Sequence, residues 1–150
     1  MKKQENIKFN LLKINTEEFA KFEENFELNV EQKNNYSFGF NFDNNKRLLF
    51  WGFEIESSCN SNLFLKGKFS FVFQFSIDSW ESLKQKDQIV FPKNLIAHVS
   101  MLSVGTIRGI LYEKLSKLST PLSNYILPLI NLSEIITEDV VINLNDTEAE

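Results

Sequence analysis

The clearest pattern in the chain is a two-residue alternation over residues 63–77. Apart from Gly67, every odd position there carries a large apolar side chain, whereas most even positions are polar or charged. Side chains at alternate positions of a β-strand point to opposite faces of the sheet, so this segment is predicted to be a strand with one apolar and one polar face. Such strands are typical of an antiparallel sheet that is covered on one side only.

Three earlier segments predict three further strands, although their alternation is less regular. Residues 47–57 place Trp51, Phe53 and Ile55 on one face and Phe50, Glu54 and Glu56 on the other. Residues 28–42 alternate at both ends around a polar middle, where a bend or bulge is expected. The two are joined by residues 43–46, an Asp-Asn-Asn-Lys segment whose side chains suit a hairpin turn. In the first segment, residues 7–14, apolar side chains fall on both faces, which predicts a bulge or a two-sided environment.

The segment between the first two strands has two interpretations. Phe19, Phe22 and Phe26 are separated by three and then four positions. This spacing is compatible with a helical turn that carries an apolar stripe. It is equally compatible with an irregular continuation of the first strand, in which the aromatic side chains act as anchors.

A helical pattern follows the strands. Residues 78–88 are mostly polar and predict a crossover with about one helical turn at most. Pro92 then suits the first turn of a helix, and apolar residues recur at helical spacing as far as residue 118. Gly105 and Gly109 lie inside this helix, where two glycines cost about 2 kcal/mol relative to alanine, so close packing or a kink is expected there.

The elements after the long helix are shorter. The helix is expected to end at Thr120-Pro121, because a proline restricts the residue before it. Residues 125–129 are expected to be extended, residues 132–136 to form a short second helix, and residues 140–144 to be extended or frayed. The order of elements predicts an α+β fold, in which a four-stranded antiparallel sheet carries one long helix and a short second helix on one face.

Length and charge indicate one domain with an acidic end. The 150 residues, of which 43% are apolar and 24% charged, suit a single domain with its own core, expected over residues 1–137. The formal net charge is −4, and no basic residue follows Lys117. Residues 138–150 are therefore expected to be a solvated acidic tail, with docking of a basic partner as the alternative. Because the lysines are scattered among acids, no nucleic-acid partner is expected.

The chain is expected to be cytoplasmic and not inserted in a membrane. Its one cysteine, Cys59, cannot form an internal disulfide, which fits a reducing compartment. No uninterrupted apolar run approaches the ~18 residues of a membrane-spanning helix. The charged N-terminus leads into no apolar core of the kind found in secretion signals.

Reactive side chains form no recognisable catalytic motif. His98 lies alone in the helical pattern, and Cys59 lies in a polar link. Glu54 and Glu56 share a strand face, as paired catalytic carboxylates would, but solvated residues are the favoured interpretation. Arg108 is expected to make structural contacts rather than to bind an anion. With no phosphate-binding loop or metal-spaced Cys/His set, we expect no catalytic residues, no metal site, no cofactor and no enzyme activity.

Several aromatic residues lie outside the strict alternation and exceed what one sheet face and one helix need. Apolar residues left over at loops can mark an exposed binding patch. The long helix also offers apolar residues beyond those that the sheet needs, which predicts a homo-oligomer. The aromatic residues predicted to bind a partner are Phe19, Phe22, Phe26, Trp80, Tyr112 and Tyr125.

Taken in order, short motifs across the chain resemble the SecB family, chaperones that hold preproteins unfolded for export. Residues 9–19 are similar to the family's first strand, with an aromatic start, a basic–isoleucine pair and a threonine before an acid. Residues 90–92, Val-Phe-Pro, match the apolar-Phe-Pro that opens its long helix. Arg108-Gly109 matches its Arg-Gly, and residues 127–134 are similar to its Ala-Pro-Val-Asn-aromatic-Asp segment. The resemblance covers most of the chain.

The resemblance implies both an assembly and a function. It implies homodimers that pair into homotetramers, with apolar grooves that hold unfolded or nascent polypeptides. Phe22 and Phe26 fall where the family places groove aromatics. A SecA-type motor is the family's usual acceptor and docks on acidic residues of the sheet; Glu18 matches one such acid, and Glu23 lies near another.

The sequence also departs from the family. Lys66 stands where the family has an acid, the metal-binding Cys/His tail is absent, and the second helix is shorter. An alternative function is therefore a dedicated binding module for one partner, as in SecB-like proteins that serve toxin–antitoxin pairs.

Overall fold

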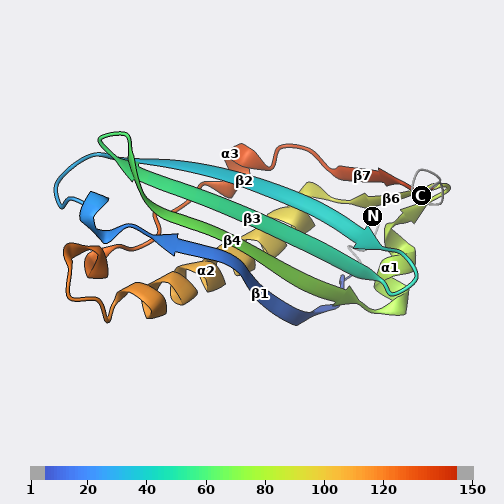
Figure 1. Ribbon diagram of the computed structural model, residues 1–150. Helices are drawn as coiled ribbons and strands as arrows, with labels where there is room; N and C mark the ends of the chain where they lie inside the picture. The colour runs from blue at the N-terminus through green and yellow to red at the C-terminus, as the bar shows by residue number, and fades with distance from the viewer. Residues whose placement is uncertain (1–5, 145–150) are drawn as a thin grey trace.

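The computed structural model describes residues 6–144, and its main feature is a four-stranded antiparallel sheet (Figure 1). The strands run in the spatial order β1-β4-β3-β2, so that β1 and β2 form the two edges. The helices lie on one face of this sheet, which confirms the predicted α+β fold. The strands are β1 (Phe9–Lys21), β2 (Gln32–Asp43), β3 (Leu48–Cys59) and β4 (Asn62–Phe75).

The helical layer is dominated by α2, which runs across the sheet. Short elements surround it: α1 (Ile77–Leu83), α3 (Leu132–Ile135), and the 3₁₀ helices η1 (Glu23–Asn25) and η2 (Pro121–Asn124). α2 (Lys93–Leu115) begins directly after Pro92, as predicted, but ends before the expected stop at Pro121, which instead begins η2. The short second helix that was expected after residue 131 is α3.

A small second sheet was not predicted. It contains β5 (Lys84–Gln85), β6 (Gln88–Phe91) and β7 (Val140–Asn143), in the order β5-β6-β7. β7 therefore confirms the extended prediction for residues 140–144, but it also shows that part of the expected acidic tail is a paired strand. The acids Asp146, Glu148 and Glu150 lie outside the described residues.

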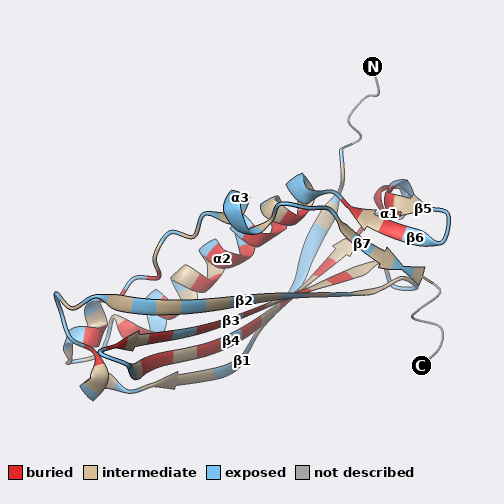
Figure 2. Ribbon diagram, turned by 90° about the horizontal axis from the view of Figure 1, so that it is seen from above, coloured by how far each residue is buried: buried red, intermediate tan, exposed pale blue. Residues whose placement is uncertain are grey.

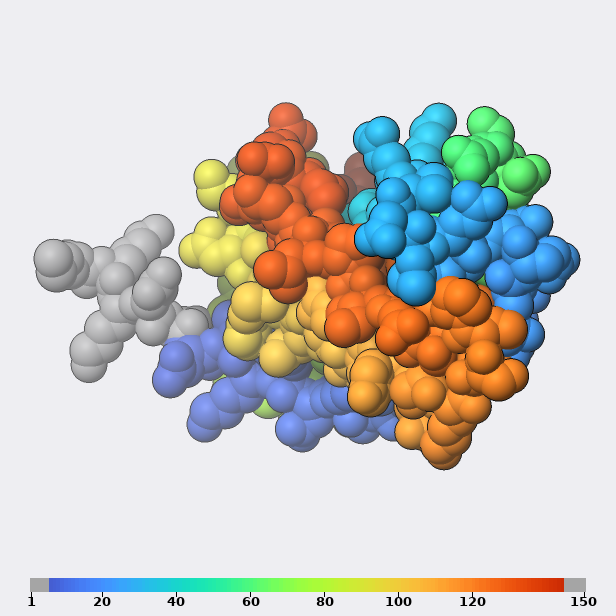
Figure 3. All heavy atoms as spheres, turned by 90° about the vertical axis from the view of Figure 1, so that its left-hand side faces the viewer, coloured from blue at the N-terminus to red at the C-terminus, as the bar shows by residue number. Residues whose placement is uncertain are grey.

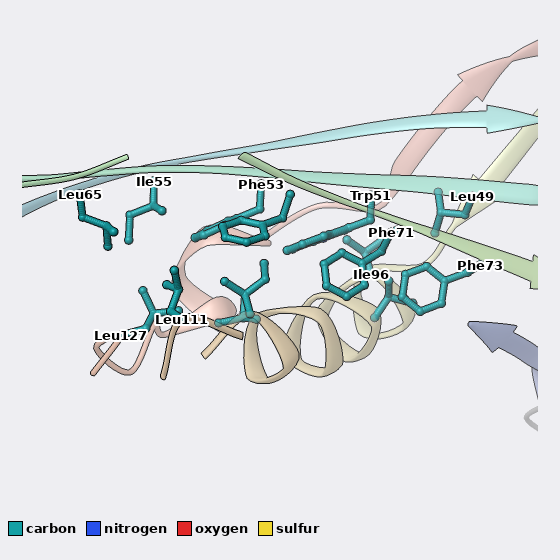
Figure 4. Packing of buried hydrophobic residues seen from close by; sticks show 14 of the residues in the cluster. Leu49, Trp51, Phe53, Ile55, Leu65, Phe71, Phe73, Ile96, Leu111 and Leu127 are labelled. Atoms are coloured by element: carbon teal, nitrogen blue, oxygen red, sulfur yellow. The ribbon is translucent and has the colours of Figure 1, made fainter. Parts of the chain in front are cut away.

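The core lies between the sheet and α2, as the buried residues in Figure 2 show. Large side chains such as Trp51 and Phe71 point from the sheet toward the helix, where Ile96 and Leu111 meet them (Figure 4). The Trp51 Nε1–H donates to Ser100 Oγ at 2.9 Å, so a small buried serine lets the indole ring lie over the helix.

The predicted close packing at the two helix glycines is wrong. A Cβ atom built on Gly105 or Gly109 would meet nothing within 4 Å, and both residues are exposed. The small residues that do face the sheet are Ser100 and Ser103, which are 0% and 1% exposed.

A bulge in β4 changes the predicted alternation. Ser57 pairs with Leu65 and Ser58 with Leu63, so Phe64 is the extra residue in the ladder. A bulge turns a side chain out of its expected phase, and Phe64 is buried although the two-residue period places it on the polar face.

The N-terminal half of the sheet also differs from the prediction. β1 continues to Lys21, so the strand interpretation holds for Phe19, and η1 follows before Phe26. The bulge predicted early in β1 is present between Leu11 and Lys13. β2 begins only at Gln32, and its pairing with β3 has no bulge, contrary to the expectation for its polar middle.

By length and composition alone, α2 is long and apolar enough to cross a membrane, although it contains no uninterrupted apolar run of that length. A core helix of a folded protein meets the same test, and one side of α2 is buried against the sheet.

Candidate functional site

Three of the six aromatic residues predicted to bind a partner belong to the core instead. Phe26, Trp80 and Tyr125 are 6%, 0% and 2% exposed. The rings of Phe26 and Tyr125 pack edge-on against Phe64, with centroids 4.9 and 5.5 Å away. The Trp80 Nε1–H donates to Asn44 Oδ1 at 2.8 Å. The expected surface position is wrong for these three because η1, α1 and η2 close over the ends of the sheet, which a strand period does not reveal.

The other three aromatic residues reach the surface. Phe22 is 40% and Tyr112 57% exposed, and Phe19 is half-buried. The Lys114 Nζ lies 5.2 Å from the centroid of the Phe19 ring, a cation–π contact that covers part of that ring. Phe19 and Phe22 belong to the β1 edge of the sheet, so they lie at the opposite edge from β2.

The two acids that the resemblance assigns to motor docking are both engaged within the chain. The Glu18 carboxylate lies 3.3 Å from Lys66 Nζ. The Glu23 carboxylate accepts a hydrogen bond from Thr120 Oγ1 at 2.7 Å and lies 3.8 Å from Lys21 Nζ. Lys66 therefore offsets the charge of Glu18.

An apolar groove that the sequence did not single out lies beneath β2. It measures 580 Å³ and separates the inner face of this edge strand from the segment that joins α3 to β7. Figure 3 views the molecule from the end at which β2 begins, and a hollow separates the upper parts of the red-orange segment near the C-terminus and the light-blue chain leading into β2. The lining residues include Tyr36, Phe38, Phe40, Ile96, Ile136 and Val140.

The groove aromatics are half-buried because β2 is an edge strand. The Tyr36 ring stacks on Phe53 at 5.8 Å, and the Phe38 ring lies 5.8 Å from Trp51 and 5.2 Å from Phe53. One side of each ring thus rests on the core, while the other side borders the groove together with Phe40. The sequence revealed their alternation, but it did not reveal that this strand, rather than another, lies at the edge.

Polar contacts to α2 hold the far wall of the groove and the chain that leads to it. The Arg108 side chain donates from Nε to Leu127 O at 3.0 Å and from Nη2 to Pro128 O at 3.2 Å. Asp139 Oδ1 accepts a hydrogen bond from the Lys93 backbone N–H at 2.8 Å, which satisfies one free donor at the start of the helix. Arg108 therefore has the structural role expected of it, and it fixes the chain on its way to the groove wall.

The groove is apolar inside and acidic at its rim. Burial raises the pKa of Tyr36, and the positive charge of Arg108 partly opposes that shift, so the phenol stays neutral at physiological pH. Among the described residues that line the groove, the ionisable groups at its rim are Glu138 and Asp139. The site therefore offers aromatic faces and aliphatic side chains to an apolar ligand, with negative charge beside it.

Tyr125 anchors the start of the chain that leads to the groove wall. Burial raises its pKa to about 12, and the nearby Ser57 hydroxyl opposes the shift only in part. The Ser57 hydroxyl donates to Asn34 Oδ1, and the buried Tyr125 Oη has no hydrogen-bond partner of good geometry within residues 6–144. The residue is a packing element with an unsatisfied hydroxyl.

The opposite face of the sheet carries a second hollow, of 380 Å³, lined by charged, polar and aromatic residues that include Phe50. It lies where Gly39 and Gly52 pair across β2 and β3. Beside it, Lys68 Nζ lies 3.4 Å from the Glu54 carboxylate and 3.9 Å from the Glu17 carboxylate. These pairs are exposed and contribute at most about 1 kcal/mol each, so this face is a solvated surface, as the alternation predicts.

The reactive side chains are dispersed. Over residues 6–144, no three His, Cys, Asp or Glu side chains lie close enough together to hold a metal ion. Cys59 is buried in the core, whereas His98 is exposed, with its ring 6.1 Å from that of Phe9. Cys59 and His98 therefore do not form a catalytic pair of neighbouring side chains.

Comparison with known proteins supports the fold. No family model matches the sequence, and no curated protein is significantly similar to it. Among solved structures, the Mycobacterium tuberculosis SecB-like chaperone Rv1957, in complex with a ChAD peptide from the Rv1956 HigA1 antitoxin, is similar with a TM-score of 0.54 and 7% identity. The match covers 82% of this chain and 91% of the other. At this identity the likeness extends to the fold alone, and the fold of this chain is SecB-like.

Proposed function

We propose that this protein is a SecB-like chaperone that binds unfolded polypeptides in the groove beneath β2 and keeps them competent for export or folding. The observation that most supports this is the row of half-buried aromatic side chains, Tyr36, Phe38 and Phe40, facing an open apolar groove. The solved structure of similar fold is a SecB-like chaperone with a bound peptide, which is consistent with a polypeptide ligand.

Such a groove suits many weak contacts. Each apolar client side chain that is fully buried contributes roughly 1.5–3 kcal/mol, from which the ordering of a flexible chain must be subtracted. Aromatic and aliphatic surfaces accept side chains of varied shape, which favours a broad client set over one specific sequence. The proposal involves no bond-making chemistry and no cofactor, and it places the protein in the cytoplasm.

Exposed apolar residues elsewhere suggest where copies of the chain meet. They occur on β1 and on the side of α2 turned away from the sheet, as Leu11, Leu12, Ile14, Met101, Leu102 and Tyr112. Covering them in a homodimer or homotetramer would remove apolar surface from water. We include this assembly in the proposal and leave the groove beneath β2 free for the client.

The central experiment pairs a groove variant with a control on the other face. Phe40→Asp places a charge in the groove, whereas Phe50→Asp makes the same change beside the outer hollow. Aggregation of a chemically denatured client, followed by light scattering, should be suppressed by the native chain and by Phe50→Asp. It should proceed with Phe40→Asp. If the native chain neither suppresses aggregation nor binds a denatured client, the chaperone proposal is wrong.

A second candidate is a dedicated binding module for one partner, such as an antitoxin. The engaged acid Glu18, paired with Lys66, supports it, since docking of a SecA-type motor there would have to break this contact. The antitoxin peptide on the structural neighbour also supports it. Dissociation constants for a panel of unrelated unfolded polypeptides decide between the two. Values within about tenfold of each other indicate a general chaperone, and one value at least 100-fold lower indicates a dedicated module.

A further inference from the structure

The backbone of β2 carries a feature that its side chains alone do not show. The Phe42 backbone N–H donates to the Asn41 Oδ1 at 2.8 Å. The Phe42 N–H is therefore not used to pair with β3. The carbonyl of Gly39, by contrast, points toward β3, because Gly39 O lies only 3.7 Å from where a Cβ of the paired residue Gly52 would be. In an antiparallel pair, residues whose N–H and C=O face the neighbouring strand alternate with residues whose groups face away. Even-numbered residues of β2 therefore direct their backbone groups to the free edge.

These same even-numbered residues line the groove. Tyr36, Phe38 and Phe40 border it with their side chains, and by the alternation they also present unpaired N–H and C=O groups along the edge. Side chains at directly opposed, hydrogen-bonded positions of an antiparallel pair lie on the same face of the sheet. A strand added antiparallel to β2 would thus use one set of alternate residues both to hydrogen-bond with the edge and to enter the groove.

The edge is long, regular and open. β2 pairs with β3 without a bulge from Gln32 to Asp43, and within residues 6–144 no strand pairs with its other side. A flat edge with apolar neighbours is a template for another strand. At about 3.4 Å per residue, Tyr36 to Phe40 spans ~14 Å, which is the length of a five-residue extended segment.

We propose that the groove takes its ligand by strand addition: an extended polypeptide segment pairs antiparallel with β2 as a fifth strand, and its groove-facing residues are apolar at every second position. The acidic rim formed by Glu138 and Asp139 favours a basic residue beside that apolar run. Recognition then depends on backbone hydrogen bonds and on a two-residue period, rather than on total apolarity. The inference rests on the proposed function and specifies how the client is held.

The test uses the full chain and three fluorescently labelled peptides. The parent is Lys-Thr-Leu-Thr-Leu-Thr-Leu-Lys with blocked ends. One derivative is N-methylated at the three leucines, and the matched derivative is N-methylated at the three threonines. Methylation at leucine removes the donors that face β2, so its dissociation constant, measured by fluorescence anisotropy, should rise at least tenfold. Methylation at threonine alters amides that face away, and it should change the constant less than threefold.

A measurement on the protein checks the same contacts. On binding of the parent peptide, amide hydrogen exchange should slow at Tyr36, Phe38 and Phe40. The amide of Gly39 already faces β3 and should change little.

The outcomes separate this inference from the function on which it rests. Equal effects of the two methylations, or a larger effect at threonine, overturn antiparallel strand addition even where Phe40→Asp abolishes binding of the parent. If the parent peptide does not bind, or binds equally well to Phe40→Asp, the groove itself is not the site and both proposals fail.

Discussion

The two edges of the sheet present their backbones in opposite ways. β1 is interrupted by bulges near Leu12 and near Glu17, and it carries charged residues along its length. β2 has no bulge over twelve residues and borders an apolar groove. Bulges and charges are the usual protection of an edge strand against pairing with another chain. The proposed strand addition requires this difference, because only the unprotected edge can accept another strand.

The two edges also differ in what they expose. On β1 the exposed apolar atoms belong to side chains such as Leu12, which is 55% exposed, so a partner there would pack side chain against side chain. On β2 the aromatic side chains are half-buried, and the backbone is the accessible part. The first arrangement suits a rigid second copy of the chain, and the second suits a ligand whose sequence varies but whose backbone does not.

The largest expected effect comes from giving β2 the charge that protects β1. In Phe38→Lys/Phe40→Lys, two ring surfaces are lost and two charges face the client. Loss of about 3 kcal/mol of apolar burial corresponds to roughly 100-fold weaker client binding. The matched pair Leu12→Lys/Ile14→Lys on β1 should bind the client within twofold of the native chain, as measured by anisotropy.

This comparison requires that both double variants stay folded. The lysine stem at position 38 can still lie along Trp51, which limits the loss of packing. Thermal unfolding by circular dichroism serves as the control. Equal loss of client binding in the folded β1 and β2 variants would contradict the assignment of different roles to the two edges.

The second expected effect is on assembly, where the β1 variant rather than the β2 variant should cause the loss. Leu12→Lys/Ile14→Lys places charges on the surface that we assign to a second copy, so the dimer should dissociate at least tenfold more readily. Phe38→Lys/Phe40→Lys should leave the assembly unchanged. Size exclusion with light scattering over a range of concentrations measures both. A native chain that is monomeric at every concentration would remove the basis for the β1 assignment.

The sequence predicts those features that depend on residues close together in the chain, and it does not predict those that depend on contacts between distant segments. The alternation in β3 and β4 is local and predicted the buried face, and the apolar spacing before Leu115 predicted the long helix. The burial of Phe64 depends on a bulge, which a strict two-residue period excludes. The position of β2 at the edge depends on sheet order, which no single segment contains.

The candidate site could be predicted from the sequence only in part, for the same reason. Tyr125 and Trp80 were predicted to be exposed because their segments lack a strand period, yet short helices bury both. Arg108 and the Leu127-Pro128 pair were each singled out by the resemblance, and the structure shows that they contact each other. Such contacts between distant segments position the chain that leads to the groove wall, and no local sequence pattern predicts them.

A third, smaller effect should follow from loosening that wall. Arg108→Met removes two hydrogen bonds from a charged donor, which are worth roughly 1.5–3 kcal/mol each. Hydrogen exchange should become faster over residues 127–143, and client binding should weaken several-fold. Arg47→Met is the matched control, since Arg47 Nε also donates to a backbone carbonyl, Phe75 O, at 3.1 Å. It should cost stability and leave client binding unchanged; an equal loss of binding would indicate a general effect on the fold.

The smallest effect concerns Tyr125, at the start of the chain that leads to the groove wall. Its pKa is raised to about 12 in the folded chain, against about 10 when exposed, so the folded state holds the phenol proton more tightly. The resulting stabilisation is fully present below pH ~10 and is lost as the pH rises through ~12, with a total of about 2–3 kcal/mol. Tyr125→Phe removes this dependence.

The measurement is urea unfolding at pH 8 and pH 11 for both chains. Between these values the native chain should lose about 1 kcal/mol more stability than Tyr125→Phe. At pH 8 the variant should be equal to the native chain or slightly more stable, because the buried Tyr125 Oη makes no well-formed hydrogen bond. Client binding at pH 8 should not change, since the ring is core and not groove surface. If the free energy of unfolding changes equally with pH in the native chain and in Tyr125→Phe, the phenol is already accessible to water. Tyr125 would then again be a residue that a client can contact.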